Sequence, residues 1–505
     1  MTADRFLGDL RDRRVAGAVV AAAVALAGAV VGILLPRGPV TAAEALALMA
    51  LGLALGLGAG RLLRSRLALL APLAYMAGFE AAARGGTGPT VVGIHLGSTW
   101  GILALIAGRG FHGLVALLPL LLGAALGAAL ARRGLTPAPR GRTSRAWLYA
   151  RRAVTAAVAA GLATLAVLIA LPASTPPVRA ADGSIVPGSV AELRQVMLGG
   201  VAQWVEIRAR SADDPVLLYL PGGPGQSDLG LGRALLRDLE QHFVVVIWDG
   251  RGIGKSYASF DAGLTTDRVV ADTVELTNYL RRRFDEGKIY LFGESGGSVI
   301  GVLAVQRHPE LYHAWLGSGQ MVDPRETDLR IYRDLLAWGR AHGDSGIVRR
   351  LEGYGEPPYD SAFAYADVMG YYDELAGEYD PPAYYTRLGE SSGVGFLGLM
   401  APEYGVVDKV NAVRGLMDVF SVLYPQWQGI DFRRTAEHLA VPVYVFTGDH
   451  ELAARRDLAV EWFRDLDAPV KRLYSFANAG HATAFEHVQA FERILERVVV
   501  PETYG

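Results

Sequence analysis

The N-terminal third of this 505-residue chain is a series of long apolar runs, and no other feature constrains its fold as strongly. The first run, residues 15–35, carries no charge over 21 residues. A helix needs about 20 apolar residues to cross the hydrocarbon core of a bilayer. Further apolar segments follow at residues 40–60, 67–83, 91–108, 111–131 and 153–171. Because the pattern repeats, a cleaved signal peptide does not explain it, and we expect an all-α transmembrane region over residues 1–172.

Arginine clusters predict how this region is oriented. They precede the first run and recur at residues 61–66 and 132–152. Such clusters stay on the cytoplasmic side of a membrane. Five spans place all three clusters on that side, with segment 67–83 or 91–108 re-entrant or interfacial, whereas six spans place the third cluster opposite. We favour five and retain six as the alternative. The protein is then expected in the cell membrane, with its C-terminal part outside the cytoplasm.

Three ionisable residues lie in or near these apolar segments, namely Glu44, Glu80 and His95. An ionisable side chain within a membrane is costly and by default marks a functional site. The two glutamates, however, lie near span ends, where a charged group reaches water easily. We therefore favour structural roles at helix ends or between helices over a role in transport or proton relay.

A change of composition separates the apolar region from the rest of the chain. Residues 173–184 are rich in Pro, Ala and Ser, which predicts an extended, exposed linker. Residues 185–505 then alternate short β-branched runs with amphipathic segments, which predicts an α/β domain with a mostly parallel sheet covered on both faces. The expected strands are 216–220, 243–248, 288–292, 314–318, 442–446 and 472–476. The expected helices include 267–284, 297–307 and 483–498. The interval 320–432 breaks this rhythm and is expected to be a helical insert.

The amino-acid composition excludes some kinds of catalytic and metal site. The chain has no cysteine, which excludes a thiolate nucleophile, cysteine-ligated zinc and disulfides. Its net charge of −2 offers no argument for a nucleic-acid partner.

The stretch "GESGG" (293–297) follows an expected strand and precedes an expected helix. This is the G-x-S-x-G pattern in the strand–turn–helix setting that a nucleophilic serine requires. It predicts Ser295 as the nucleophile and the N–H of Gly296 as an oxyanion donor. The glycine-rich "LPGGPGQS" (220–227) also follows a strand, and we expect its Gly223 N–H to be the second donor. The stretch "WDGRGIGKS" (248–256) lacks the spacing of a nucleotide-binding loop and is interpreted as a structural turn.

A serine hydroxyl needs a general base to become nucleophilic. Among ten histidines, His481 lies in the loop after the last expected strand, in "NAGHATAF" (478–485). It also follows the candidate acids in the chain, so the order is serine, acid, histidine. His481 is therefore the expected base.

At these residues the sequence resembles the proline iminopeptidase family of α/β-hydrolases. The family's H-G-G-P-G, D-Q-R-G-x-G-x-S and G-x-S-W-G motifs correspond to "PGGPG", "DGRGIGKS" and "GESGG". The resemblance covers about residues 190–505 and implies an α/β-hydrolase fold with a helical cap. Pro221 and Gly250 replace the family's His and Gln, and Gly297 stands in a G-x-S-G-G where the family commonly has G-x-S-W-G. These departures bear on strict prolyl specificity more than on hydrolysis. The family's cap acids find no residue-by-residue match; Asp373, Glu374 and Glu378 are interpreted as a solvated face.

The resemblance also implies which carboxylate completes the triad. The family's acid lies three residues after a glycine, and in "TGDHE" (447–451) that position is Glu451. Asp449, one residue after the glycine, is the alternative. We expect Ser295, His481 and Glu451 to form the triad, with neither metal nor organic cofactor.

The expected function is a membrane-anchored serine hydrolase that cleaves an amide or ester, most readily an aminopeptidase of the proline iminopeptidase type acting on small peptides. One alternative is an esterase or lipase acting on lipid-derived substrates. Another is a transporter or sensor whose hydrolase-like domain only binds its ligand.

Overall fold

The computed structural model describes residues 13–84, 87–133, 142–381, 398 and 400–504. It divides the chain into two compact units. The first, here called the helical unit, comprises Met1–His95, Leu103–Pro172 and Gly405–Val410. The second, the sheet unit, comprises Leu96–Ile102, Ala173–Tyr404 and Asn411–Gly505.

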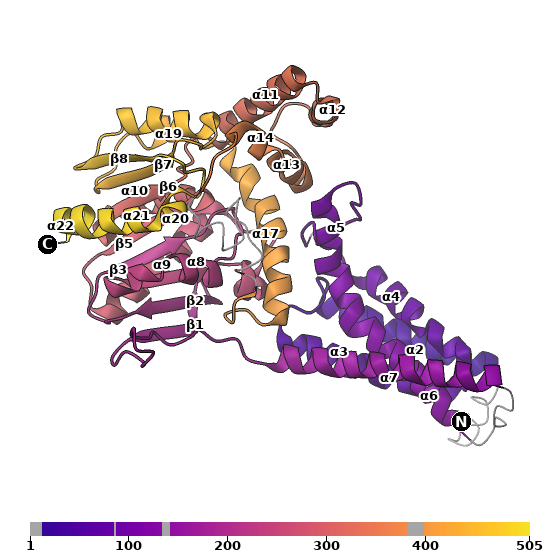
Figure 1. The fold of residues 1–505 in the computed structure, drawn as a ribbon. Coiled ribbons are helices and arrows are strands. Elements are labelled where there is room, and N and C mark those ends of the chain that lie inside the picture. The colour runs from indigo at the N-terminus through magenta and orange to yellow at the C-terminus, as the bar shows by residue number, and fades with distance from the viewer. Residues whose placement is uncertain (1–12, 85–86, 134–141, 382–397, 399, 505) are drawn as a thin grey trace. The chain divides into compact units, whose positions relative to one another are not determined.

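The described part of the helical unit is formed mainly by the helical segments between Arg13 and Ala170 (Figure 1), together with the start of α17 (Val406–Trp427). The segments between Arg13 and Ala170 are α2 (Arg13–Leu34), α3 (Ala42–Leu63), the turn η1 (Arg66–Leu70) with α4 (Ala71–Ala82), the continuous stretch from α5 (Thr99–Leu105) through η2 (Ile106–Gly110) and η3 (Gly113–Leu117) to α6 (Leu118–Ala131), and α7 (Arg142–Ala170). Four of them are long and apolar enough to cross a membrane, namely Val15–Leu34, Ala42–Leu63, Thr99–Ala131 and Arg145–Ala170.

The apolar segments 91–108 and 111–131 are joined in one continuous helical stretch. Residues 88–98 form turns and loops, and helix then runs for 33 residues to Ala131. Arg109 and Gly110 suggested a break in the sequence, but the chain passes through them as π-helical turns. The Arg109 side chain is bound by Glu80 at 2.8 Å and by the carbonyl oxygen of Pro36 at 2.9 Å.

The helices of this unit touch backbone to backbone through glycines. A Cβ on Gly56 of α3 would lie 2.0 Å from the Leu120 oxygen of α6, and one on Gly123 would lie 2.3 Å from the Leu53 oxygen. Between α2 and α4, a Cβ on Gly28 would lie 2.0 Å from the Tyr75 oxygen. Small residues are the usual means of bringing apolar helices this close.

The three ionisable residues singled out in this region are Glu44, Glu80 and His95, and the structure shows the position of each. Glu44 caps the start of α3, where its Oε2 accepts from the N–H groups of Val40 and Thr41 at 2.8 and 3.0 Å. Glu80 pairs with Arg109. His95 lies in a turn before α5 and not in a helix. The structural roles that we favoured agree with the contacts of Glu44 and Glu80.

The sheet unit contains one eight-stranded sheet in the order β1-β2-β4-β3-β5-β6-β7-β8. Strands β1 and β2 run antiparallel to their neighbours, and the other adjacent strands are parallel. The bounds are β1 (Val190–Leu198), β2 (Val201–Ala209), β3 (Val216–Leu220), β4 (Val244–Asp249), β5 (Ile289–Glu294), β6 (Tyr312–Ser318), β7 (Val443–Gly448) and β8 (Lys471–Phe476). The six expected strands are confirmed as β3 to β8.

The hairpin of β1 and β2 was not predicted. Its two-residue turn is Gly199–Gly200, with φ of 52° and 78°. Positive φ at both central residues is typical of the hairpin turn that matches the twist of antiparallel strands. The Gly-Gly pair between two alternating runs was the signal in the sequence.

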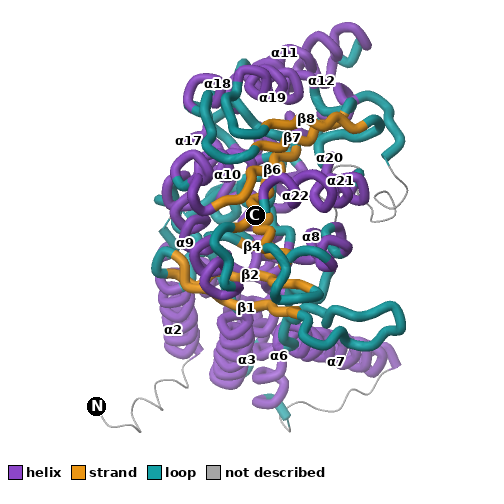
Figure 2. The backbone as a smooth tube through the Cα atoms, turned by 90° about the vertical axis from the view of Figure 1, so that its left-hand side faces the viewer, coloured by secondary structure: helices purple, strands orange, loops and turns teal. Residues whose placement is uncertain are grey.

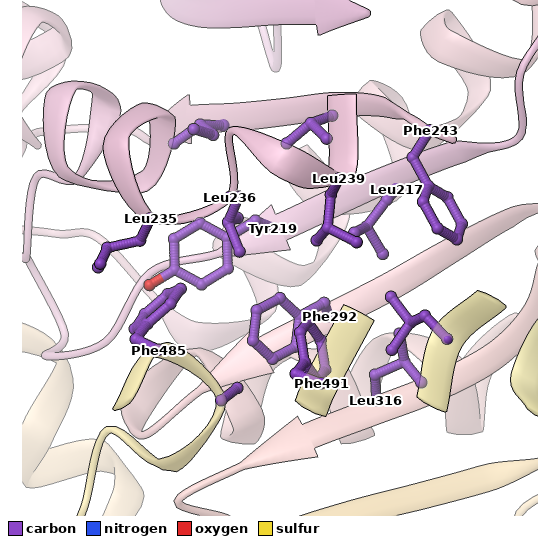
Figure 3. Close-up of a cluster of buried hydrophobic side chains, with 14 of the residues drawn as sticks. Leu217, Tyr219, Leu235, Leu236, Leu239, Phe243, Phe292, Leu316, Phe485 and Phe491 are labelled. Carbon is purple, nitrogen blue, oxygen red and sulfur yellow. The ribbon is translucent and has the colours of Figure 1, made fainter. Parts of the chain in front are cut away.

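Helices cover both faces of the sheet (Figure 2). One face carries α9 (Thr266–Phe284), α10 (Gly296–Arg307) and α19 (Ala453–Asp465), and the other carries α8 (Leu229–Leu235), α20 (Thr483–Glu486) and α21 (Val488–Ile494). Under this second face Tyr219, Phe292 and Phe491 pack together in the main core (Figure 3). The tight packing holds the strand ends that carry the candidate site in fixed positions.

The predicted insert between β6 and β7 is helical in its described part. It comprises α11 (Pro324–His342), α12 (Ser345–Tyr354), α13 (Ala362–Met369), α14 (Tyr372–Ala376), α17 (Val406–Trp427) and α18 (Phe432–Thr435). Residues 382–397 and 399 of the insert lie outside the described residues. The remaining short elements are η4 (Asp238–Gln241), η5 (Gly254–Ser259), η6 (Pro309–Leu311), η7 (Leu495–Val499) and α22 (Val500–Thr503).

The segment expected to be an exposed linker is bonded to the sheet. The Thr175 hydroxyl donates to Glu206 Oε1 of β2 at 2.5 Å, and the Arg208 guanidinium donates to the Pro176 oxygen. Arg208 is held in turn by the buried Glu240 at 2.6 Å. These residues therefore belong to the sheet unit instead of spanning a gap as a free spacer.

Candidate active site

Ser295 stands on a sharp turn between β5 and α10. Its φ of 49° and ψ of −118° are unusual for a residue with a side chain, and such strain is characteristic of a nucleophile elbow. The neighbouring glycines are required by space. A Cβ on Gly293 would lie 2.8 Å from the Gly297 oxygen, and one on Gly297 would lie 2.1 Å from the Leu220 oxygen. The sequence between these two glycines therefore folds so that the Ser295 hydroxyl projects beyond the strand end.

His481 lies in the loop between β8 and α20, with its Nε2 2.8 Å from Ser295 Oγ. Its Nδ1 is hydrogen-bonded to Glu451 Oε2. A carboxylate accepts only, so Nδ1 carries the proton and Nε2 is free to accept from the serine hydroxyl. Behind the ring there is no room for a side chain at position 319, because a Cβ on Gly319 would lie 2.8 Å from His481 Cε1.

Glu451 follows the end of β7 and is buried. Its Oε1 accepts from the Leu452 N–H at 2.8 Å and faces Arg455 at 3.6 Å. Burial raises the pKa of Glu451, but the charge and hydrogen bond of His481, the charge of Arg455 and the Leu452 N–H outweigh it, so the pKa lies below its ordinary value. The group therefore stands beside His481 as a carboxylate. The structure brings Glu451 to the histidine, whereas Asp449 is exposed and accepts from Ser475 Oγ at 2.7 Å.

The two glycines expected to donate to an oxyanion lie against each other. A Cβ on Gly296 would lie 2.3 Å from the Gly223 oxygen and 3.1 Å from its nitrogen. Gly223 has a φ of 108°, which a residue with a side chain rarely adopts. Gly296 is the first residue of α10, where a backbone N–H has no acceptor within the helix. Both backbone segments border Ser295, in the place where an oxyanion hole would form.

The stretch "WDGRGIGKS" acts as a brace, in agreement with its interpretation as a structural turn. Asp249 at the end of β4 is fully buried, and its carboxylate accepts from Ser227 Oγ at 2.9 Å and from the Lys255 N–H at 2.8 Å. Burial raises the pKa of Asp249 to about 7. Because Ser227 closes the glycine-rich loop, this carboxylate ties the loop to the end of β4.

Residues from the three motifs that differ from the iminopeptidase pattern line one small pocket. Pro221, Gly250 and Gly297 border a mostly apolar cavity of about 50 Å³ together with Trp248 and Trp427. Within the described residues the buried Trp248 Nε1 has no hydrogen-bond partner. A Cβ on Gly250 would meet Trp248 at 3.4 Å, an ordinary contact, whereas one on Gly297 would lie 2.1 Å from the Leu220 oxygen, so the pocket has room for a side chain at Gly250 and not at Gly297.

Sequence reasoning missed Glu294, the residue immediately before Ser295. Its side chain is 7% exposed, and its Oε1 lies 3.8 Å from His481 Nε2. Burial raises the pKa of Glu294 to about 7. A charged residue inside G-x-S-x-G, at the end of a wholly buried strand, was the available signal.

The acids considered in the cap do not lie in the site. Asp373 and Glu374 in α14 and Glu378 just after it are exposed. In the part of the chain that the structure describes, no cluster of three or more His, Cys, Asp or Glu side chains has the arrangement of a metal site.

Comparison with known proteins gives three results. Residues 231–344 match the model of a family described as serine aminopeptidase, S33. The probable aminopeptidase YbaC of Bacillus subtilis (strain 168) is 27% identical over 311 residues, which cover 61% of this chain and 96% of that protein. Among solved structures, a proline iminopeptidase-related protein from Thermus thermophilus is 20% identical with a TM-score of 0.42, covering 62% of this chain and 98% of the other.

Proposed function

We propose that this chain, an α/β-hydrolase enzyme, is a membrane-anchored serine aminopeptidase of the proline iminopeptidase type. The observation that carries the catalytic part is the hydrogen-bonded row from Ser295 Oγ through His481 to Glu451. The match to the serine aminopeptidase model and the similarity to a probable aminopeptidase support a peptide substrate.

The proposed reaction passes through an acyl-enzyme. Ser295 Oγ attacks the substrate carbonyl while His481 Nε2 accepts its proton, and the same nitrogen then donates that proton to the leaving group. Glu451 holds the Nδ1–H and stabilises the imidazolium cation. The N–H groups of Gly223 and Gly296 stabilise the oxyanion. Water, deprotonated by His481, then releases the acyl group and restores Ser295.

The helical unit supports the membrane part of the proposal. Four of its helices have the length and composition of membrane spans. With the segment Arg66–Ala82 as a fifth span, the arginine clusters at 61–66 and 132–152 fall on one side, and the chain after α7 emerges on the other. We propose that the sheet unit lies outside the cytoplasm.

The full chain in detergent micelles tests the catalytic proposal. A fluorophosphonate probe should label the wild type and not Ser295→Ala. Prolyl and other aminoacyl anilides should be hydrolysed in the same preparation. Turnover of short-chain esters alone would favour the esterase or lipase alternative, and absence of labelling would favour a ligand-binding domain of a transporter or sensor.

A further inference from the structure

The proposed mechanism leaves one buried carboxyl next to the nucleophile without a role. Glu294 ends β5, and its Oε1 faces His481 Nε2 at 3.8 Å. Its Oε2 faces the glycine-rich loop, because a Cβ on Gly222 would lie 2.7 Å from that oxygen. The carboxyl therefore stands between the loop and the catalytic histidine, directly beside Ser295.

Around Glu294 the buried acidic side chains are not all paired with basic ones. Glu451 is matched by His481 and Arg455. Asp228, by contrast, is a second buried acid and accepts from neutral groups, Tyr219 Oη at 2.9 Å and Gln226 Nε2 at 3.0 Å. Burial raises the pKa of Glu294 to about 7 and that of Asp228 to about 6, and the charge of Asp228 adds to the rise at Glu294. The site thus holds more acidic than basic groups. A cation from the substrate would stabilise the ionised form of Glu294.

The position of Glu294 suits a cation attached to the carbon next to the reacting carbonyl. Since Ser295 Oγ and Glu294 Oε1 lie 2.8 and 3.8 Å from the same His481 nitrogen, they are at most about 6.6 Å apart. In an acyl-enzyme three bonds join the α-nitrogen to the serine oxygen, which places the two atoms up to about 3.6 Å apart. An ammonium–carboxylate hydrogen bond adds about 2.8 Å. An α-ammonium group therefore reaches Glu294 from an acyl group bound to Ser295.

We propose that Glu294 binds the protonated α-amine of the substrate and so selects acyl groups that carry a free N-terminus. The inference rests on the proposed aminopeptidase function and names the group that makes it specific. Gln226 Oε1, which lies 3.3 Å from the same Gly222 Cβ position, faces the same spot and is a second acceptor for the ammonium. The cap acids Asp373 and Glu374 are exposed and are not needed for this contact.

A pair of substrates that differ in one group tests the proposal with the full chain in detergent. Alanine benzyl ester carries the α-amine, and benzyl propionate lacks it. Glu294→Gln keeps the shape of the side chain and removes its charge. We expect kcat/KM for alanine benzyl ester to fall about 10- to 100-fold, mainly through KM, as for loss of a charged hydrogen bond. Benzyl propionate should change by less than about threefold.

Glu486→Gln is the matched control. Glu486 is also buried, and its carboxylate accepts from the Gly480 N–H at 2.7 Å, next to His481. Loss of this charge should change both esters by the same factor. The rate of fluorophosphonate labelling, measured in each variant, reports whether Ser295 and His481 still function.

Two outcomes would overturn the role of Glu294. An equal loss on both esters in Glu294→Gln would mean that the carboxyl acts on His481 or on the fold, and an unchanged rate on alanine benzyl ester would mean that it does not bind the amine. Hydrolysis by the wild type distinguishes these two outcomes from failure of the proposed aminopeptidase function. If the wild type hydrolyses no substrate with a free α-amine, the aminopeptidase proposal fails, and the role of Glu294 fails with it.

Discussion

The two units of this chain treat their charged groups in opposite ways. In the helical unit the Glu44 carboxylate caps the start of α3, and Glu80 forms an ion pair with Arg109. In the sheet unit the buried carboxyls of Glu451 and Glu294 both face His481, and burial raises the pKa of Glu294. The contrast indicates that the first unit uses charge to hold helices together, whereas the second keeps charge available for a reaction.

Their glycines show the same contrast. Gly56 lets α3 touch the backbone of α6, with no reactive group in the contact. Gly297 lets the turn of Ser295 fit beneath the glycine-rich loop. The same absence of a side chain serves helix packing in one unit and the geometry of the candidate site in the other. Variants that affect one unit and spare the other therefore test the comparison.

The largest effect is expected for Ser295→Ala. Loss of the nucleophile should lower kcat at least about 10⁴-fold, since the residual rate comes from binding and oxyanion donors alone. Thermal unfolding of the full chain should be unchanged, because Ala keeps the Cβ that is strained at this positive φ. Steady-state hydrolysis of aminoacyl anilides measures the first, and calorimetry the second. Retained activity would remove the catalytic assignment of the sheet unit.

The next effect separates the two candidate acids. Glu451→Gln should lower kcat about 10³-fold or more, because His481 loses the carboxylate that holds its Nδ1–H. Asp449→Asn, the matched change at the exposed neighbour, should leave kcat within about threefold. Parallel kinetics of the two variants decide between them. A large loss confined to Asp449→Asn would reverse the assignment.

In the helical unit, Gly56→Leu should lower stability by about 3 kcal/mol or more, because its Cβ would lie 2.0 Å from the Leu120 oxygen. Gly58→Leu in the same helix meets no atom within 4 Å and should be neutral or stabilising. Thermal denaturation in detergent measures both. Hydrolysis by the folded fraction should be the same in the two variants, and a selective loss of activity in Gly56→Leu would show that the comparison between units is too simple.

A pH-dependent effect of similar size is expected at Glu294. Its pKa is raised to about 7, so the folded state holds the proton more tightly than the unfolded state. Stability is therefore lost as the pH rises from about 4.5 to 7. Glu294→Gln should be more stable than the wild type at pH 8, by on the order of 3 kcal/mol, and equal to it near pH 4.5. Denaturant titrations at the two pH values measure this, and a constant difference would exclude the ionisation of Glu294 as its cause.

The smallest effect is expected at Gly250, beside the small pocket. A Cβ there would meet Trp248 at 3.4 Å, an ordinary contact. Gly250→Ala should raise stability by about 0.5–1 kcal/mol through the unfolded state. Gly297→Ala, whose Cβ would lie 2.1 Å from the Leu220 oxygen, should instead destabilise the protein and lower activity. Equal behaviour of the two would mean that the pocket wall is not rigid.

Much of the fold was predictable because its signals are local. Six strands were found from short β-branched runs, and the membrane-like helices from apolar length. The continuity of the helix through Arg109 could not be predicted, because the charge of Arg109 is paired with Glu80, 29 residues earlier, which no local window contains. The linker is extended and mostly exposed, as expected, but its bonds to the sheet were not foreseen, since the partners of Thr175 and Pro176 lie on β2.

The sequence by itself determined which groups exist and how the chain turns at each of them. The glycines of "GESGG" and of "LPGGPG" specify sharp backbone turns, which depend on steric limits within a few residues. The tertiary structure alone decided which groups meet. It brings Glu451 to His481, leaves Asp449 in solvent and encloses Glu294 next to the nucleophile. Burial and the approach of strands far apart in the chain set these outcomes, and both arise only when the sheet has packed.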